Sequence, residues 1–172
     1  MVEYIMMRRK EREVTDLDSI EEILLKCRTC HLAMADGGEP YVVPLSFGYR
    51  FTEKDELELF FHSAHEGKKL DILRKNSRVC FEISDEGVLE NAQSPCDMGY
   101  FYSSVIGFGE VVFLKEAADK CTGLAAIVKR QTGRDMLFTD KQTEAVCVYK
   151  VVSADFSGKQ KKGEGDQNEQ TL

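Results

Sequence analysis

The sequence predicts a mainly β protein, built as a closed antiparallel barrel of about six strands with short helices outside it. Apolar residues alternate with other residues over short segments, as at Leu57, Leu59 and Phe61. Most links between these segments are shorter than the roughly dozen residues that a parallel crossover needs, so neighbouring strands should be antiparallel. Gly107 and Gly109 interrupt a long aromatic segment, as glycines do where a barrel strand bends.

Composition predicts a cytoplasmic globular protein. Its 172 residues fit one domain, expected over residues 1–158 and followed by a polar, disordered tail over 159–172. The net charge of −7 argues against general nucleic-acid binding, which needs a basic surface. No apolar run approaches the roughly 20 residues that cross a bilayer, and the first residues lack a signal peptide's apolar core. The six cysteines mostly occupy apolar patterns and are expected to be reduced.

The first predicted elements are a helix and a hairpin. Ser19 and Glu22 have the spacing of a capping box, which predicts a short amphipathic helix from Ser19. A strand is expected over 29–35, a tight turn over 36–40 and a returning strand over 41–51. Pro44 lies in that returning strand and has no N–H to donate, so the strand should lie at a sheet edge or contain a bulge.

The returning strand has two unlike faces. One face is bulky and expected to be buried, and the other is small enough for a flat group to lie against it. The bulky face comprises Tyr41, Val43, Leu45 and Phe47, and the small face comprises Pro44, Ser46 and Gly48.

The remaining elements follow from the same kinds of pattern. After a turn over 53–55, a third strand carries the alternating apolar residues at 57, 59 and 61, and the helix after Ser63 runs to about Lys75. We expect a fourth strand over 78–83, an irregular acidic segment over 84–98, a bent strand over 99–114, a helix from about 117 that stops at Gly133, and a last strand over 145–156.

The start of the helix after the third strand is the richest part of the chain in chemistry. Ser63 and Glu66 again have the spacing of a capping box. The free N–H groups of the first helical turn, the helix dipole and the ammonium groups of Lys68 and Lys69 would together bind an anion such as a phosphate. The alternative is a solvent-exposed helix with a good cap and no ligand.

Two further features leave alternatives open. His62 alternates with Phe61, which places it on the face opposite the core. There it could form a structural hydrogen bond, contact a cofactor ring or donate a proton. Cys27 and Cys30 have C-x-x-C spacing, which is open to a redox or metal role. Cys27 also completes the apolar stripe of the first helix, which favours a place in the core.

Several common enzyme motifs are absent. The chain contains no G-x-G-x-x-G, no P-loop, no G-x-S-x-G and no H-E-x-x-H. These absences exclude dinucleotide-fold enzymes, P-loop ATPases and the common hydrolases.

Four segments in order carry a resemblance to a known family. They are residues 7–10 (MRRK), 41–49 (YVVPLSFGY), 61–64 (FHSA) with 66–69 (EGKK), and 104–109 (SVIGFG). The set resembles the flavin-nucleotide-binding proteins of the pyridoxamine 5'-phosphate oxidase-like superfamily, and within it the nitroimidazole-resistance (Nim-type) branch. The resemblance covers about residues 7 to 162.

The resemblance implies a split β-barrel homodimer with two FMN sites at the subunit interface. Members of the branch are proposed to reduce nitroimidazoles to amines, and the histidine that matches His62 is tied to that chemistry, so His62 is the expected catalytic residue. Ser104 and Val105 would complete the FMN site from the partner subunit. Within one chain, the ring would lie along Val43, Pro44, Leu45, Ser46 and Phe47, be flanked by His62, Ser63 and Ala64, and have its phosphate near Gly67, Lys68 and Lys69.

The chain also departs from the family pattern. Residues 1–6 extend beyond the usual start, and Ser103 stands where many relatives have a larger polar or charged residue. That substitution leaves the partner's contacts to the phosphate open. The arginine-rich substrate signature of true pyridoxamine phosphate oxidases is absent, so oxidation of vitamin B6 is not expected.

Three functions remain from the sequence. The first is an FMN-dependent reductase of a small aromatic or nitro-aromatic substrate, with electrons from a nicotinamide donor. The second is a non-catalytic flavin carrier or sensor, and the third is a cofactor-free dimerisation domain. Related folds also bind haem or a deazaflavin, and His62 or His65 would then be the axial ligand of a haem. No metal ion, nucleic acid or membrane partner is expected.

Overall fold

The computed structural model describes residues 7–90, 92, 94 and 98–163. Every strand pair in these residues is antiparallel, which confirms the mainly β, antiparallel prediction. The described strands number nine rather than about six, because two short strands are added and the predicted strand 41–51 is divided in two. They are β1 (Glu13–Val14), β2 (Thr29–Asp36), β3 (Glu39–Ser46), β4 (Gly48–Phe51), β5 (Leu57–Ser63), β6 (Arg78–Ser84), β7 (Val88–Glu90), β8 (Gly99–Phe113) and β9 (Cys147–Lys161).

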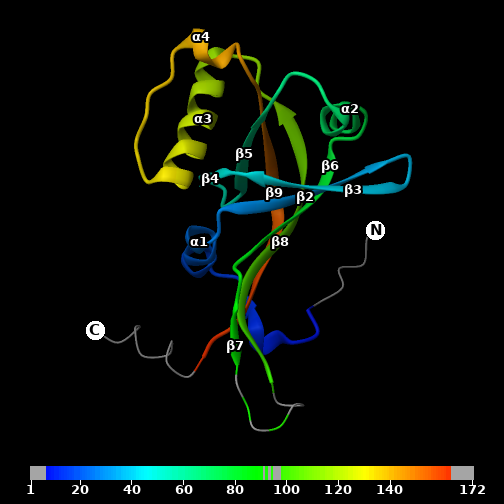
Figure 1. Ribbon diagram of the computed structural model, residues 1–172, viewed down its shortest axis with the longest axis vertical. Helices are drawn as coiled ribbons and strands as arrows, with labels where there is room; N and C mark the ends of the chain where they lie inside the picture. Colours follow the sequence, from blue (N-terminus) through cyan, green and yellow to red (C-terminus); the bar gives the residue numbers. More distant parts are fainter. Residues whose placement is uncertain (1–6, 91, 93, 95–97, 164–172) are drawn as a thin grey trace.

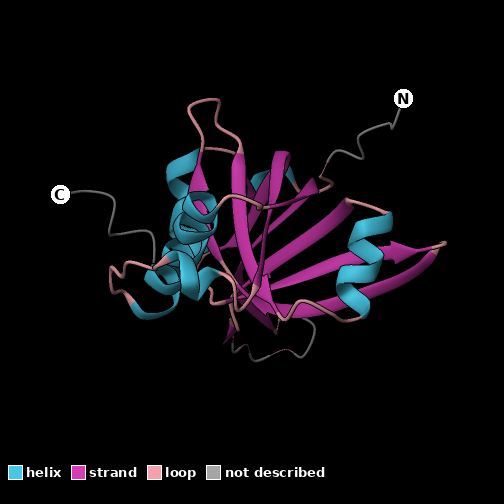
Figure 2. Ribbon diagram, turned by 90° about the horizontal axis from the view of Figure 1, so that it is seen from above, coloured by secondary structure: helices cyan, strands magenta, loops and turns pink. Residues whose placement is uncertain are grey.

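Helices lie around the sheet (Figures 1 and 2). They are the 3-10 turn η1 (Lys10–Arg12) and the α-helices α1 (Leu17–Lys26), α2 (Lys68–Lys75), α3 (Ala117–Thr132) and α4 (Asp140–Thr143). The predicted capping box at Ser19 is wrong, because α1 begins two residues earlier and Asp16 caps it by accepting a 2.9 Å hydrogen bond from the Ser19 N–H. The predicted stop at Gly133 is confirmed, since this residue is left-handed, with φ 73°.

The two end strands of the sheet are neighbours in the sequence. The strand order is β3-β2-β6-β8-β9-β5-β4, so β3 and β4 are the two ends of the sheet, yet only Phe47 separates them in sequence. The edge position of β3 confirms the expectation from Pro44. Up to Ser46 the strand pairs with β2, and from Gly48 it pairs with β5. This change of partner divides the predicted single strand.

Two apolar clusters hold the fold together. The barrel interior contains the larger cluster, in which Phe61 stacks on Tyr149 with 5.6 Å between ring centroids. The smaller cluster packs α3 against the outside of the barrel through Phe60, Leu124, Ile127 and Val148. α3 also holds the junction between β3 and β4, because the side-chain amide of Gln131 donates to the Phe47 carbonyl at 3.1 Å.

The long strands β8 and β9 extend away from the barrel and carry β7 at the end opposite α4 (Figure 1). β9 begins at Cys147 and continues to Lys161, which is longer than the predicted strand 145–156 and three residues past the expected domain end at 158. β7 forms within the segment predicted to be irregular. The expected disorder at 164–172 lies outside the described residues. No helix in the described part of the chain is long and apolar enough to cross a bilayer.

Candidate functional site

The turn from β5 into α2 forms the centre of the candidate site; we call residues 62–69 the β5–α2 corner. Ser63 is the last residue of β5 and pairs with Cys147 of β9. The predicted capping box of Ser63 and Glu66 is therefore wrong, because sheet pairing continues through Ser63 and α2 starts only at Lys68. The Ser63 hydroxyl instead donates to the carbonyl of Ala64 at 2.9 Å. The predicted anion site can therefore form only at the observed start of α2, at Lys68.

That helix start has no cap from any side chain. Gly67 is the N-cap residue, with φ 136°, and no side-chain hydrogen bond reaches the first turn. A Cβ built on Gly67 would meet no atom within 4 Å, so the approach to the turn is open. The first N–H groups of an α-helix have no partner inside the helix, and the helix dipole places partial positive charge beside them. An anion is the chemically suited partner for this end of α2.

Two lysines supply full positive charge at the same place. Lys68 is exposed, and its Nζ lies 4.5 Å from the centroid of the Tyr41 ring on β3. Lys69 is half-buried, and this partial burial lowers the pKa of its ammonium group. A bound anion would oppose that effect, since it favours the charged form of the amine.

His62 lies on the outer face of β5, as predicted from its alternation with the buried Phe61. Its side chain is exposed, but partial desolvation by its neighbours lowers the pKa of the imidazole, and the charge of Lys69 lowers it further. The neutral imidazole therefore dominates at pH 7, with one nitrogen as donor and the other as acceptor. In this state His62 is suited to hydrogen bonding or ring contact.

Strand β3 presents the expected alternation only in part. Val43 and Leu45 are half-buried on the inner face, and Pro44 and Ser46 are exposed on the outer face. Phe47 is fully buried in the core, so its side chain is not free to contact a ligand. Gly48 does not belong to an open small face, because α3 covers it: an added Cβ would lie 2.4 Å from the backbone of Ala126 and Ile127.

The register shows where the strands separate. Gly48 of β4 is opposite Phe60 of β5, so continued pairing would place Ser46 opposite His62. Instead, Ser46 is opposite Thr29, because β3 pairs with β2 along its whole length up to Ser46. The chain therefore leaves β5 at Phe47, so the β3 residues expected to lie along the ring are not paired with the β5 residues expected to flank it.

Ser104 and Val105 lie on β8, which β2 and β6 separate from β3 in the sheet order. Val105 is fully buried in the core opposite Ile83 and Gly158, and its side chain cannot reach a ligand. Ser104 is half-buried on the outer side of the same strand. This chain does not bring either residue to its own β5–α2 corner by strand pairing.

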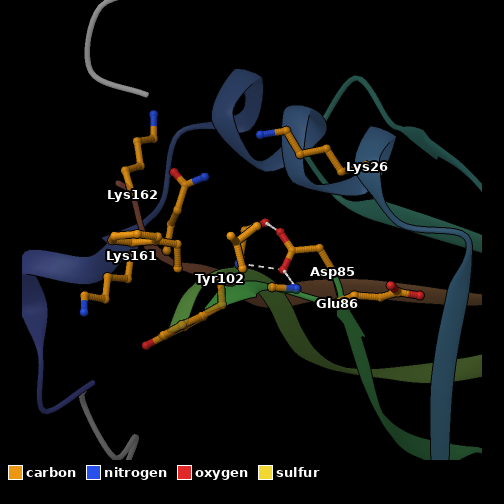
Figure 3. A pocket seen from close by; sticks show the side chains of 11 residues that line it. Lys26, Asp85, Glu86, Tyr102, Lys161 and Lys162 are labelled. Carbon is orange, nitrogen blue, oxygen red and sulfur yellow. Dashed lines mark hydrogen bonds between the residues drawn. The ribbon is translucent and has the colours of Figure 1, made fainter. Parts of the chain in front are cut away.

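A cavity of about 330 Å³ opens elsewhere, beside the end of α1 and the extended ends of β8 and β9 (Figure 3). Asp85 and Ser103 are bonded to each other there, with Ser103 Oγ donating to Asp85 Oδ2 at 2.5 Å. Asp85 also accepts from the N–H groups of Ser103 and Gly87, so it holds the turn after β6. The cavity shares no residue with the β5–α2 corner. Sequence reasoning missed it, although the Asp-Glu-Gly sequence at 85–87 is a turn signal.

The C-x-x-C pair has a structural place. Cys27 and Cys30 are both buried free thiols, and burial raises the pKa of Cys27 to about 11 and also raises that of Cys30. The reactive thiolate is thus suppressed in both residues. The described residues contain no group of three metal-binding side chains.

The family model described as pyridoxamine 5'-phosphate oxidase matches residues 16–160. A candidate 5-nitroimidazole antibiotic resistance protein from Bacteroides thetaiotaomicron is similar in structure, with 30% identity, TM-score 0.73 and coverage of 86% of this chain and 85% of that one. No curated protein sequence matches.

Two more distant structures share the fold. The flavocytochrome Anf3 from Azotobacter vinelandii has 22% identity and TM-score 0.72, covering 91% of this chain and 72% of that one. A FAD and heme binding protein from Mycobacterium smegmatis has 20% identity and TM-score 0.74, covering 88% of this chain and 74% of that one.

Proposed function

Because this chain belongs to the pyridoxamine 5'-phosphate oxidase family, we propose that it is a cytoplasmic FMN-binding flavoprotein whose β5–α2 corner holds the phosphate of the flavin. The observation that carries the proposal is the uncapped start of α2, where unpartnered N–H groups lie beside Lys68 and Lys69. A phosphate held by several charge-assisted hydrogen bonds gains from each of them.

The residues present fit FMN. The N–H groups of α2 and the two lysines suit the phosphate, and the free edge of β3 leaves its backbone open to the ring system, with Val43 and Leu45 turned toward the core. Exposed Pro44 and Ser46 are small enough for a ring to approach the backbone. Phe47 and Val105 would contribute through their backbone only, because their side chains are in the core.

Within this proposal, flavin supplies the redox chemistry when bound. The protein's own residues bind and orient the flavin, and they exclude water from it. The start of α2 fixes one end of the ligand through its phosphate, and strand β3 lies along the ring. His62 is neutral at pH 7 and contributes a hydrogen bond or a ring contact from the end of β5.

We further propose a homodimer with FMN at the subunit interface. Its support is an apolar row across the outer face of the sheet, where Val42, Ala33, Cys80 and Phe108 are consecutive cross-strand neighbours. Val42 is 57% exposed and Phe108 53% exposed. Exposed apolar patches of this kind mark interaction surfaces, and a second copy of the chain would cover this one.

For the reaction, we propose reduction of a small aromatic or nitro-aromatic substrate, which is supported by the 30% identity to the Bacteroides structure. The competing proposal is a flavin carrier or sensor. It is favoured by the lowered pKa of His62, which reduces the share of protonated imidazole that could act as an acid. Haem binding, named for the more distant Mycobacterium smegmatis protein, would use an exposed histidine such as His62.

The first experiment is an absorption spectrum of the purified protein, followed by titration of FMN into protein stripped of ligand. Flavin bands and saturable FMN binding are expected. A haem spectrum would favour the haem alternative, and a colourless protein that ignores FMN would leave the cofactor-free dimerisation domain. Substrate-dependent turnover of the bound flavin under anaerobic conditions then separates a reductase from a carrier.

A further inference from the structure

We propose that His65 is a positioning residue for the phosphate site. Its imidazole, together with the guanidinium of Arg74, holds the turn before α2 in the conformation that presents the helix start to an anion. This inference rests on the proposed FMN site and adds two residues to it, neither of which contributes through contact with the ligand.

The turn needs such support because its local sequence provides little. Residues 64–67 connect β5 to α2 and are all exposed. Gly67 has φ 136°, a conformation that glycine visits freely and does not enforce. No side chain caps the helix that follows. An exposed turn with few contacts of its own opens easily unless neighbouring elements hold it.

Two hydrogen bonds hold the turn, one through the His65 side chain and one through the His65 backbone. The Nε2 of His65 lies 2.8 Å from the carbonyl oxygen of Glu144, and since a carbonyl only accepts, Nε2 carries the hydrogen. Arg74 Nη2 donates to the carbonyl of His65 at 3.0 Å. Arg74 also bonds Asp71 Oδ1 at 3.3 Å, which keeps the guanidinium on the same side of α2.

These bonds connect the turn to the strand that carries His62. Glu144 follows α4 and lies three residues before β9, and β9 pairs with β5 at Cys147 and Ser63. The turn is therefore fixed to α2 through Arg74 and to the sheet through His65. A site held in its binding conformation loses less conformational entropy when the ligand arrives, which raises affinity without a new contact.

The test compares FMN with riboflavin, which has the same ring system and no phosphate. Dissociation constants are measured by flavin fluorescence for His65→Ala, His65→Gln, Arg74→Ala and the wild type. We expect His65→Ala and Arg74→Ala to weaken FMN binding about tenfold, the size of one hydrogen bond, and to leave riboflavin binding unchanged. His65→Gln should restore most of the affinity, because its amide offers an N–H donor at similar reach.

Arg134→Ala is the matched control for Arg74→Ala, since Arg134 is an exposed arginine in the loop after α3. It should bind FMN like the wild type. A wild type that does not bind FMN overturns both the proposed function and this inference. A wild type that binds FMN, with His65→Ala binding it equally well, overturns the positioning role alone.

An equal loss of FMN and riboflavin binding would also overturn the inference, because it would indicate a general structural role. A second measurement needs no ligand. The N–H of Asp71 donates to the Gly67 carbonyl at 3.2 Å and closes the first turn of α2. Amide hydrogen exchange at residues 71–73 should be faster in His65→Ala than in the wild type, and unchanged exchange would contradict the proposed restraint on the turn.

Discussion

Lys68 Nζ lies 4.5 Å from the centroid of the Tyr41 ring, which joins the first residue of α2 to the edge strand β3. This cation–π contact holds one ammonium group at the helix start, while the next residue, Lys69, is half-buried beside His62. The two neighbouring lysines therefore occupy different environments, and their removal should have separable effects.

Replacement of both lysines in Lys68→Ala plus Lys69→Ala should weaken FMN binding by tenfold or more. Each hydrogen bond to a charged group contributes about 1.5–3 kcal/mol, and about 1.4 kcal/mol corresponds to tenfold. Riboflavin binding should change little. The control is Lys75→Ala at the other end of α2, where the lysine forms only a surface ion pair with Asp36 at 3.7 Å. Equal FMN affinity in the double variant and the wild type would refute the phosphate site.

Lys69→Ala alone should raise the pKa of His62, because the charge of Lys69 is one of the two causes that lower it. An NMR titration of the three histidines measures this, with His31 as an internal control. Since native His62 binds its proton less tightly than the unfolded chain does, its contribution to stability falls as the pH drops below about 6.5. A His62 pKa that stays constant on removal of Lys69 would contradict the electrostatic contact.

Tyr149→Phe should stabilise the protein. The Tyr149 hydroxyl is the only buried side-chain polar atom without a hydrogen-bond partner in the described residues. An unsatisfied buried group costs about 1–3 kcal/mol, and its removal should raise the thermal midpoint by about 2–4 °C per kcal/mol. Tyr49→Phe is the matched control, because that hydroxyl donates to Glu21 at 3.1 Å and its loss should bring no gain. A lower midpoint for Tyr149→Phe in a thermal melt would indicate a partner for the hydroxyl.

Gly48→Ala should destabilise the fold by about 2–3 kcal/mol or more, the upper range for overpacking. The added methyl group would lie 2.4 Å from the backbone of α3, which cannot move aside like a side chain. Gly99→Ala is the control, since its Cβ would approach only the side-chain ends of Glu90 and Lys161. Chemical denaturation measures both. Equal stability of the two variants would show that α3 is not seated against β4.

Local patterns predicted the parts of the fold that depend on local chemistry. The edge position of β3 followed from Pro44, and the outward side of His62 followed from its alternation with Phe61. Both capping boxes were wrong for identifiable reasons. Asp16 is an equally good cap that comes earlier, and Ser63 is kept in β5 by pairing with β9, an interaction between residues distant in sequence.

Several features of the candidate site depend on packing between residues that are distant in the sequence. Nothing near Gly48 in the sequence indicates that α3 would cover it, and nothing near Phe47 indicates that the strand changes partner there. Lys68 and Lys69 do lie at the start of α2, as expected. His65 was missed as a restraint on the turn because its partner, the Glu144 carbonyl, is 79 positions away in the chain.

The prolines of β3 bear on how the protein behaves in concentrated solution. An outermost strand normally offers its N–H and C=O groups to any other extended chain, and this is a common start of aggregation. Pro40 and Pro44 remove two donors from β3 and interrupt any ladder that a second strand could add there. The outermost strand can therefore remain uncovered by another element of the chain with little tendency to recruit strands from other molecules.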